Sequence, residues 1–252
     1  MPTDVESQPL PAVVFIHGGC HNSQAWNETL SALRARRPDL NAFAIDLPGR
    51  GAIEGDLASL TVDGCAQSVI TQIDERLGHE TPLVLVGHSM AGVVIPRVVG
   101  RIGGGRVRRF ISVACCMPPA GQSIVDSLPR AVRLLASPVL GKPIIERVPF
   151  LVSRFIFGNR ASRAQRARIR HSACREGSAL ITTRVSDYQS LRDIPVGWVL
   201  PTRDRAVPPR KQRAAMAALG GFDRMTTIDA GHEVLITHPD EVAEHILAMV
   251  LR

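Results

Sequence analysis

Three residues of this 252-residue chain have the types and the chain order of a nucleophilic serine site: Ser89, Asp204 and His232. A serine hydroxyl is a weak nucleophile at neutral pH, so it needs a base within hydrogen-bond reach. A histidine base in turn needs an acid that fixes its tautomer and stabilises the imidazolium. We therefore predict Ser89 as the nucleophile, His232 as the base and Asp204 as the orienting acid. Asp229 is the alternative acid, but it lies only three residues before His232, on the same expected strand.

The residues around Ser89 suit a sharp turn between a strand and a helix. The pentad 87–91 reads Gly-His-Ser-Met-Ala, with small residues at Gly87 and Ala91 where such a turn is crowded. Ala91 departs from the commonest form of the motif, which has glycine there. A serine at the start of a helix also places backbone N–H groups near developing negative charge. We expect the N–H groups of Met90 and Gly19 to form the oxyanion hole.

Short apolar runs along the chain predict the elements that must position these residues. Continuous runs of this kind are typical of strands buried on both faces of a parallel sheet, and longer helical patterns lie between them. The sixth run is the weakest. The runs span residues 13–16, 42–45, 83–86, 110–113, 198–200 and 225–228. Helices are expected over residues 24–37, 61–77, 90–101, 209–219 and 239–251.

The alternation predicts an α/β fold with three layers, a mostly parallel sheet of about six strands between helices. In such sheets the chemistry lies beyond the carboxyl ends of the strands, and the three candidate residues all follow strand runs. Residues 118–194 have helix-like pieces and prolines but no comparable strand run. We interpret 118–194 as a helical cap inserted after the fourth strand, with 1–117 and 195–252 forming the core of one domain.

The net charge of +7 is concentrated in the expected cap. Residues 118–194 contain 13 Lys and Arg residues against 5 Asp and Glu residues. Within them, residues 159–170 place arginines at steps of three and four, which predicts a helix with one cationic face. A cationic helix face usually contacts only solvent and has no specific binding function. The sharper hypotheses are attraction of an anionic substrate, or weak contact with an anionic membrane surface or an acidic partner.

Composition excludes several other classes of function. One Tyr and two Trp provide few platforms for stacking bases, so we predict no nucleic-acid partner. Five scattered cysteines favour neither disulfides nor a structural metal. Residues 1–10 lack the apolar segment of a secretory signal, and the longest apolar stretch, 143–157, contains charges and is too short to span a membrane. We therefore expect a cytoplasmic protein without a structural metal.

These motifs resemble those of the α/β-hydrolase superfamily over nearly the whole chain. A closer resemblance is to the plant methylesterase and hydroxynitrile lyase group and its bacterial relatives. It is carried by Gly18-Gly19-Cys20-His21 with Trp26, by Gly87-His88-Ser89-Met90 and by Ala114-Cys115-Cys116-Met117-Pro118. The resemblance implies a cofactor-free esterase with its pocket between core and cap. Lyases of this kind resemble one another in having threonine at the position of Gly18 and lysine at that of Glu233, so both residues disfavour lyase chemistry.

The expected activity is hydrolysis of a small or medium carboxylic ester through an acyl-enzyme. Hydrolysis of a thioester, a lactone or a carbon–carbon bond by the same three residues is the alternative within enzymes. A ligand receptor with an intact but non-hydrolytic site is the alternative from another class. By adjacency to the strand ends, Cys20, His21 and Met117 are the candidates for lining the substrate pocket.

Overall fold

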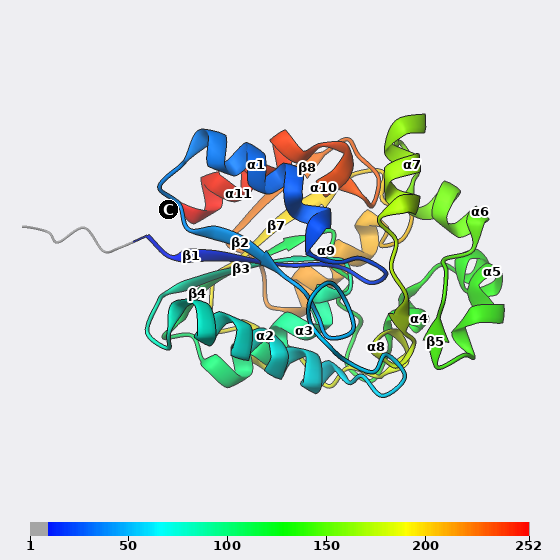
Figure 1. The fold of residues 1–252 in the computed structure, drawn as a ribbon, viewed down its shortest axis with the longest axis horizontal. Coiled ribbons are helices and arrows are strands. Elements are labelled where there is room, and N and C mark those ends of the chain that lie inside the picture. The colour runs from blue at the N-terminus through cyan, green and yellow to red at the C-terminus, as the bar shows by residue number, and fades with distance from the viewer. Residues whose placement is uncertain (1–9, 252) are drawn as a thin grey trace, which may run out of the picture.

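A six-stranded parallel sheet forms the centre of the molecule (Figure 1). The structure, a computed structural model, describes residues 10–251. The strand order is β2-β1-β3-β4-β7-β8. The fold class predicted from the sequence is therefore confirmed. The strands are β1 (Ala12–Ile16), β2 (Ala42–Ile45), β3 (Leu83–His88), β4 (Val107–Val113), β7 (Val196–Pro201) and β8 (Arg224–Ile228).

The strands are apolar on both faces because helices cover both faces. In β1, Val13 and Phe15 pack into one hydrophobic cluster with the helices α1 and α11, whereas Val14 and Ile16 pack into a second cluster with α2, α3 and α9. Alternate side chains of a strand point to opposite faces, so two separate clusters follow from one continuous apolar run. Figure 1 shows the resulting three layers, with α1 and α11 on one side of the sheet and α2 and α3 on the other.

Recognisable end signals set the limits of the helices. Thr61 accepts a hydrogen bond from the Gly64 amide at the start of α2, and Pro239 begins α11, with two acidic residues in its first turn. The helix expected over 24–37 begins instead with a 3₁₀ turn, Ser23–Trp26. The core helices are α1 (Asn27–Arg36), α2 (Val62–Leu77), α3 (Ala91–Ile102), α9 (Pro209–Ala218), α10 (Val234–Thr237) and α11 (Pro239–Val250).

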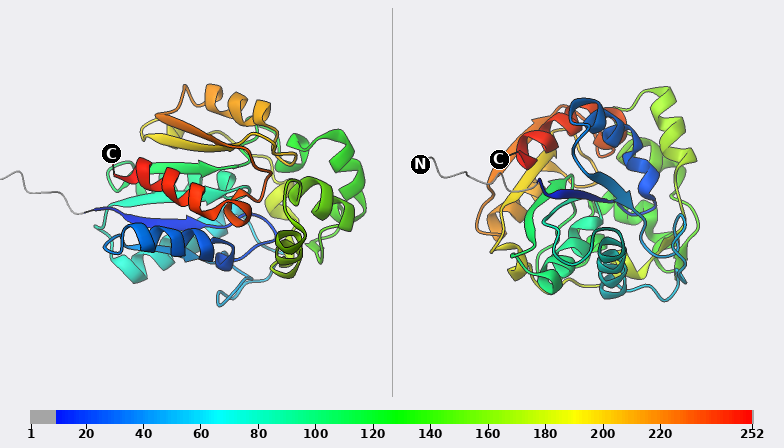
Figure 2. Two further views of the ribbon diagram at one scale, coloured as in Figure 1. Left: turned by 90° about the horizontal axis from the view of Figure 1, so that it is seen from above. Right: turned by 60° about the vertical axis from the view of Figure 1, so that its left-hand side comes forward.

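The chain between β4 and β7 lies over the carboxyl ends of the sheet strands, at the right of the left-hand view in Figure 2. Its two short antiparallel strands, β5 and β6, were not expected from the sequence. Each has only two residues, too few to produce a periodic signal. The elements of this segment are α4 (Ile124–Ser127), α5 (Arg130–Leu140), β5 (Ile144–Ile145), α6 (Phe150–Val152), a π-helical turn (Ser153–Phe157), α7 (Arg163–His171), β6 (Glu176–Gly177), α8 (Ala179–Thr182) and a 3₁₀ turn (Gln189–Leu191). Treating the segment as a separate cap stays a prediction.

The arginine-rich helix is shorter than expected. It is α7, which starts after Ser162, because the Ser162 hydroxyl and the Gln165 side chain form a capping box. Arg160 lies outside the helix with a φ of 66° and pairs with Asp229. Arg168 pairs with Glu28 of α1. These ion pairs reduce the free positive charge of the segment, and contact with an anionic surface stays a prediction.

None of the helices within residues 10–251 combines the length and the hydropathy that a membrane span requires. Over the same residues, no cluster of three or more His, Cys, Asp or Glu side chains is arranged to hold a metal ion. The start of the chain, from which we expect no secretory signal, lies almost wholly outside the described residues. The cytoplasmic location stays a prediction.

Candidate active site

Ser89 occupies the sharp turn between β3 and α3. Its φ is 51°, a left-handed conformation that a residue with a side chain rarely adopts. The turn is crowded on both sides. A Cβ added to Gly87 would lie 3.0 Å from the Ala91 Cβ, and one added to Gly92 would lie 2.6 Å from the Cys116 carbonyl oxygen. The small residues singled out in the pentad are therefore needed for the chain to turn at this point.

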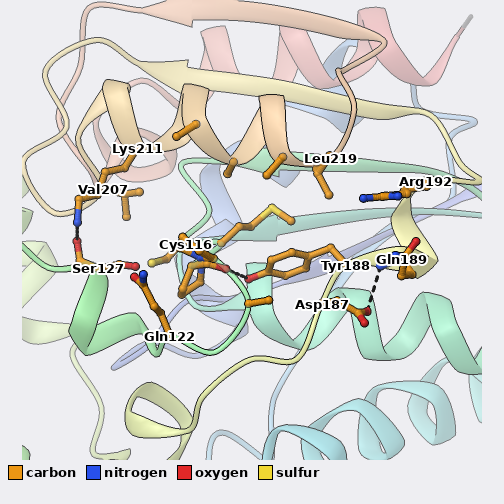
Figure 3. Close-up of a pocket in the computed structure, with 17 residues that line it drawn as sticks. Cys116, Gln122, Ser127, Asp187, Tyr188, Gln189, Arg192, Val207, Lys211 and Leu219 are labelled. Carbon is orange, nitrogen blue, oxygen red and sulfur yellow. Dashed lines mark hydrogen bonds between the residues drawn. The ribbon is translucent and has the colours of Figure 1, made fainter.

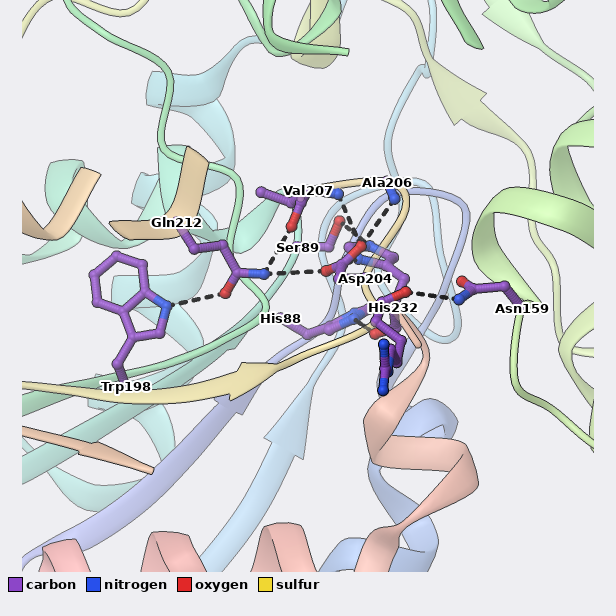
Figure 4. Close-up of polar contacts among 10 residues, drawn as sticks. His88, Ser89, Asn159, Trp198, Asp204, Ala206, Val207, Gln212 and His232 are labelled. Carbon is purple, nitrogen blue, oxygen red and sulfur yellow. Dashed lines mark hydrogen bonds and ion pairs between the residues drawn. The ribbon is translucent and has the colours of Figure 1, made fainter. Parts of the chain in front are cut away.

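The structure brings Ser89, His232 and Asp204 together at the carboxyl ends of three strands (Figure 4). The His232 Nε2 lies 2.9 Å from the Ser89 Oγ, and its Nδ1 lies 2.9 Å from the Asp204 Oδ2. His232 and Asp204 are buried, at 1% and 3% exposure. This is an unbroken hydrogen-bonded chain from a hydroxyl to a carboxylate through an imidazole, the arrangement that makes a serine nucleophilic.

Four donors hold the Asp204 carboxylate in place. Its Oδ1 accepts hydrogen bonds from the backbone N–H groups of Ala206 and Val207, both at 2.8 Å. Its Oδ2 accepts from His232 and, at 3.2 Å, from the Gln212 side chain. Gln212 is fully buried, and its own oxygen accepts from the Trp198 indole N–H. Gln212 could not be found from the sequence, because a polar residue on an amphipathic helix gives no signal of what it contacts.

The alternative acid does not reach the histidine. Asp229 is 59% exposed and pairs with Arg160 and Arg203. His88 supports His232 from the other side: its Nε2 donates to the His232 carbonyl oxygen at 3.1 Å. Burial lowers the pKa of His88 to about 3, so this ring stays neutral and in one tautomer.

The Met90 side chain contacts Gly19, and the oxyanion hole formed by the N–H groups of these two residues stays a prediction. A Cβ added to Gly19 would lie 3.5 Å from the Met90 Sδ. Neither amide donates to a protein acceptor within residues 10–251. Two free N–H groups beside a nucleophile can stabilise negative charge on a substrate oxygen.

A buried carboxylate from β6 holds the loop that contains Gly19. The Glu176 Oε2 accepts from the Cys20 N–H at 2.9 Å, and the Cys20 carbonyl accepts from the Cys174 N–H at 2.8 Å. Cys20 has a φ of 59°, so these contacts stabilise a strained backbone. The other oxygen of Glu176 forms an ion pair with Arg50, and both side chains are at most 1% exposed. Sequence reasoning missed this pair, which joins the loops after β1 and β2 to β6.

Glu176→Ala should lower the free energy of unfolding by about 3–5 kcal/mol, because it leaves the Arg50 guanidinium buried without its counter-charge. Chemical denaturation followed by circular dichroism measures the change. The matched control is Glu146→Ala, since Glu146 also pairs with an arginine but in an exposed position. Equal stability of the two variants would contradict a structural role for the buried pair.

Gly18 lies directly behind the Ser89 turn. A Cβ at this position would be 2.8 Å from the His88 Nδ1 and 2.9 Å from the Ser89 Cβ. Gly18→Ala should therefore displace Ser89 and reduce kcat roughly 100-fold. Steady-state kinetics on an ester tests this. Gly141→Ala is the control, because a Cβ there meets nothing within 4 Å. Wild-type kcat in Gly18→Ala would show that the close approach does not matter.

Ser89 lines a cavity of about 120 Å³ between the core and the segment 118–194. Its volume is below the roughly 300–1,000 Å³ common for drug-sized ligands, which favours a compact ligand. Cys20 and His21 line it, as expected, together with Glu176 and Glu233. The segment 118–194 contributes much of the apolar wall, and Met90, Ala206 and Val207 of the core contribute the rest. The apolar lining residues from 118–194 include Ile124, Leu128, Val148, Phe157, Ile169 and Ile181.

Met117 does not line the cavity that contains Ser89, and its role in substrate binding stays a prediction. Met117 lines a different cavity, of about 340 Å³, together with Tyr188 and Lys211 (Figure 3). Cys116 and Val207 line both cavities, so they form the wall between them. Adjacency to a strand end placed Met117 near the site, but adjacency does not fix which side of that wall a side chain occupies.

Comparison with known proteins shows the family of this chain. A family model described as the alpha/beta hydrolase family matches residues 13–245. The chain belongs to this family. Among solved structures, an extracellular alpha/beta-hydrolase from a Paenibacillus species superposes with a TM-score of 0.79 at 25% identity, over 95% of this chain and 98% of that one. It is described as sharing structural and functional homology with tobacco salicylic acid binding protein 2. A methylesterase from Arabidopsis superposes with a TM-score of 0.75 at 15% identity, over 96% of this chain and 99% of that one, and this likeness concerns the fold alone.

The curated relatives of this alpha/beta hydrolase carry esterase names. An esterase from rice (Oryza sativa subsp. japonica) is 26% identical over 120 residues, which are 47% of this chain and 44% of the relative. A carbendazim-hydrolysing esterase from a Nocardioides species is 28% identical over 125 residues, 47% of this chain and 48% of the relative. The matched segments thus span less than half the length of these relatives.

Proposed function

We propose that the protein is a serine hydrolase that cleaves a small or medium carboxylic ester through an acyl-enzyme. The observation that carries this proposal is the hydrogen-bonded chain from Ser89 through His232 to Asp204, which opens into a small, mostly apolar cavity. The esterase names of the relatives support the same bond class. Neither a metal nor an organic cofactor takes part in the proposed steps.

Each step uses groups already in contact. The His232 Nε2 takes the proton of the Ser89 hydroxyl as the Oγ attacks the ester carbonyl carbon. The N–H groups of Gly19 and Met90 stabilise the negative oxygen of the tetrahedral intermediate. The intermediate collapses, His232 gives its proton to the departing alcohol, and the acyl group stays on Ser89. A water molecule, deprotonated by His232, then attacks the acyl-enzyme carbonyl. As the second tetrahedral intermediate collapses, His232 gives this proton to the Ser89 Oγ and the acid is released.

Two measurements test the proposal. Nitrophenyl esters of increasing acyl length should be hydrolysed, with kcat/KM highest for short chains because the cavity is small. A fluorophosphonate should label the protein once, and peptide mass spectrometry should place the label on Ser89. Turnover of thioesters or lactones with no ester turnover would favour the alternative bond classes. A slow single turnover that ends in a stable adduct would favour a receptor, and a label on another residue would overturn the proposal.

The pH dependence should follow the ionisation of His232. Burial of this ring disfavours its charged form, but the adjacent Asp204 carboxylate outweighs burial, so the pKa of His232 is raised above 6.5. Only the neutral ring can accept the serine proton. The value of kcat/KM should therefore be low in acid and rise through an apparent pKa above 6.5. A pH profile between about 5 and 9 tests this, and an inflection below 6.5 would contradict it.

A further inference from the structure

The cavity above Ser89 contains a buried charged pair for which the proposed steps have no use. His21, in the loop after β1, and Glu233, directly after His232, both line this cavity. Their side chains are 7% and 2% exposed, and the His21 Nε2 lies 3.3 Å from the Glu233 Oε2. Removing two charges from water is costly, so we expect a pair at this position to have a function that offsets this cost.

Hydrogen-bond chemistry fixes the charge state of the pair. The His21 Nδ1 lies 2.9 Å from the Gly19 carbonyl oxygen, which can only accept, so Nδ1 must hold a hydrogen. The Nε2 faces a carboxylate, which also only accepts, so it must hold one as well. Burial opposes this charge, but Glu233 outweighs burial and raises the pKa of His21 to about 9. Burial likewise opposes ionisation of Glu233, but His21 lowers its pKa to about 2.

The pair still has unused hydrogen-bonding capacity. The His21 Nε2 and the Glu233 Oε2 are in ion-pair contact but not in hydrogen-bond geometry, and neither has another hydrogen-bond partner within residues 10–251. Buried polar atoms are normally satisfied, and leaving one unsatisfied is costly. One buried, unsatisfied donor and one buried, unsatisfied acceptor thus belong to two neighbouring residues that line a mostly apolar cavity.

We propose that His21 and Glu233 form a recognition subsite for a hydroxyl group of the ester. A hydroxyl can donate to the Glu233 carboxylate and accept from the His21 N–H at the same time. The pair has no net charge. An ammonium group at the same place is repelled by the positive His21, and a carboxylate is repelled by the negative Glu233. A hydrogen or methyl group in the same place leaves both atoms unsatisfied. This inference rests on the proposed esterase function and narrows it to hydroxylated esters.

The test compares matched esters that differ only by hydroxyl against hydrogen. One series of nitrophenyl esters places the hydroxyl at successive carbons of the acyl chain, and a second series uses acetates of diols and of the corresponding simple alcohols. At one position or more, the hydroxyl should raise kcat/KM roughly 10- to 100-fold, the size expected for hydrogen bonds to charged groups. Ammonium and carboxylate groups at that position should not.

Variants connect the preference to the pair. In the double variant His21→Phe with Glu233→Met, which replaces both charges by apolar groups, the ratio between hydroxyl and hydrogen esters should fall to near one. His79→Phe is the matched control, since His79 also pairs with a carboxylate but is 80% exposed, and it should keep the wild-type ratio.

The ratios of kcat/KM between hydroxyl and hydrogen esters, measured on the wild type, test the subsite even if the double variant does not fold. A ratio near one at every position in both series overturns the subsite, as does an equal gain from an ammonium or a carboxylate group. Turnover of the esters without a hydroxyl tests the proposed function separately. Hydrolysis without hydroxyl preference would leave the esterase proposal intact and remove only the subsite.

Discussion

Replacing Ser89 by alanine is expected to lower kcat for ester hydrolysis by about 10⁶-fold. The Ser89 Oγ is the atom that His232 activates, at a distance of 2.9 Å, and alanine has no group that can attack the carbonyl. The backbone donors at Gly19 and Met90 remain in the variant. A residual rate of roughly 10³–10⁴ above the uncatalysed reaction should therefore survive. Single-turnover assays at high enzyme concentration can measure this rate.

Loss of activity in Ser89→Ala must be separated from loss of structure. The φ of 51° at Ser89 is equally strained for alanine, so the unfolding free energy should change little. Ser137→Ala is the control, because Ser137 is an exposed serine on α5 whose hydroxyl contacts only the helix backbone. It should keep wild-type kcat. Turnover in Ser89→Ala that matches the wild type would mean that another group does the chemistry.

The central sheet could be predicted from the sequence because its signal is local. The run 13–16 is apolar at every position and forms most of β1, since both faces of that strand are buried. The weakest run, 225–228, became β8, the edge strand, where only part of the side chains are buried. Helix ends were predicted to within a few residues where a cap is visible, as at Thr61.

The meeting of Ser89, Asp204 and His232 could also be predicted, although 143 residues separate the serine from the histidine. Parallel strands bring their carboxyl ends to one edge of a sheet, so residues that follow strand runs meet without any pairwise signal. The order of the strands determines where backbones lie, but not where side chains point. The position of Met117 just after β4 therefore does not determine which cavity its side chain lines.

Contacts made by irregular segments could not be predicted. Glu176 contacts Cys20 across 156 residues, and it comes from a strand of two residues with no periodicity. From the sequence, Glu233 indicates only that the lysine of the lyases is absent at this position. Its pairing with His21 depends on how two loops approach each other, which neither spacing nor composition determines. The residues that could select the substrate are therefore those about which the sequence is least informative.

Asp204→Asn should lower kcat by about 10⁴-fold while leaving the fold intact. Asparagine has the shape of aspartate, but its oxygen and its NH₂ group are not equivalent. The Oδ1 position accepts from two backbone N–H groups, so the amide oxygen of asparagine must stay there. The NH₂ group then faces the His232 Nδ1, where the carboxylate accepted a hydrogen bond before.

The expected loss follows from the tautomer of His232. An NH₂ group can only donate, so Nδ1 must become the acceptor and Nε2 must hold the proton. A protonated Nε2 cannot take the proton of Ser89. The control is Asp229→Asn, which alters the alternative acid and removes only exposed ion pairs, so its kcat should stay close to wild type. Kinetics of both variants, with unfolding measured in parallel, test the assignment.

The pH profile of Asp204→Asn distinguishes a wrong tautomer from a shifted pKa. Asp204 raises the pKa of His232, so the asparagine variant should have a lower one and a larger neutral fraction in acid. If ionisation alone mattered, the variant would be relatively more active than the wild type at low pH. A wrong tautomer instead lowers the rate where His232 is neutral in both proteins. A large loss that persists on the alkaline plateau of both pH profiles therefore supports tautomer control, and recovery of wild-type kcat there contradicts it.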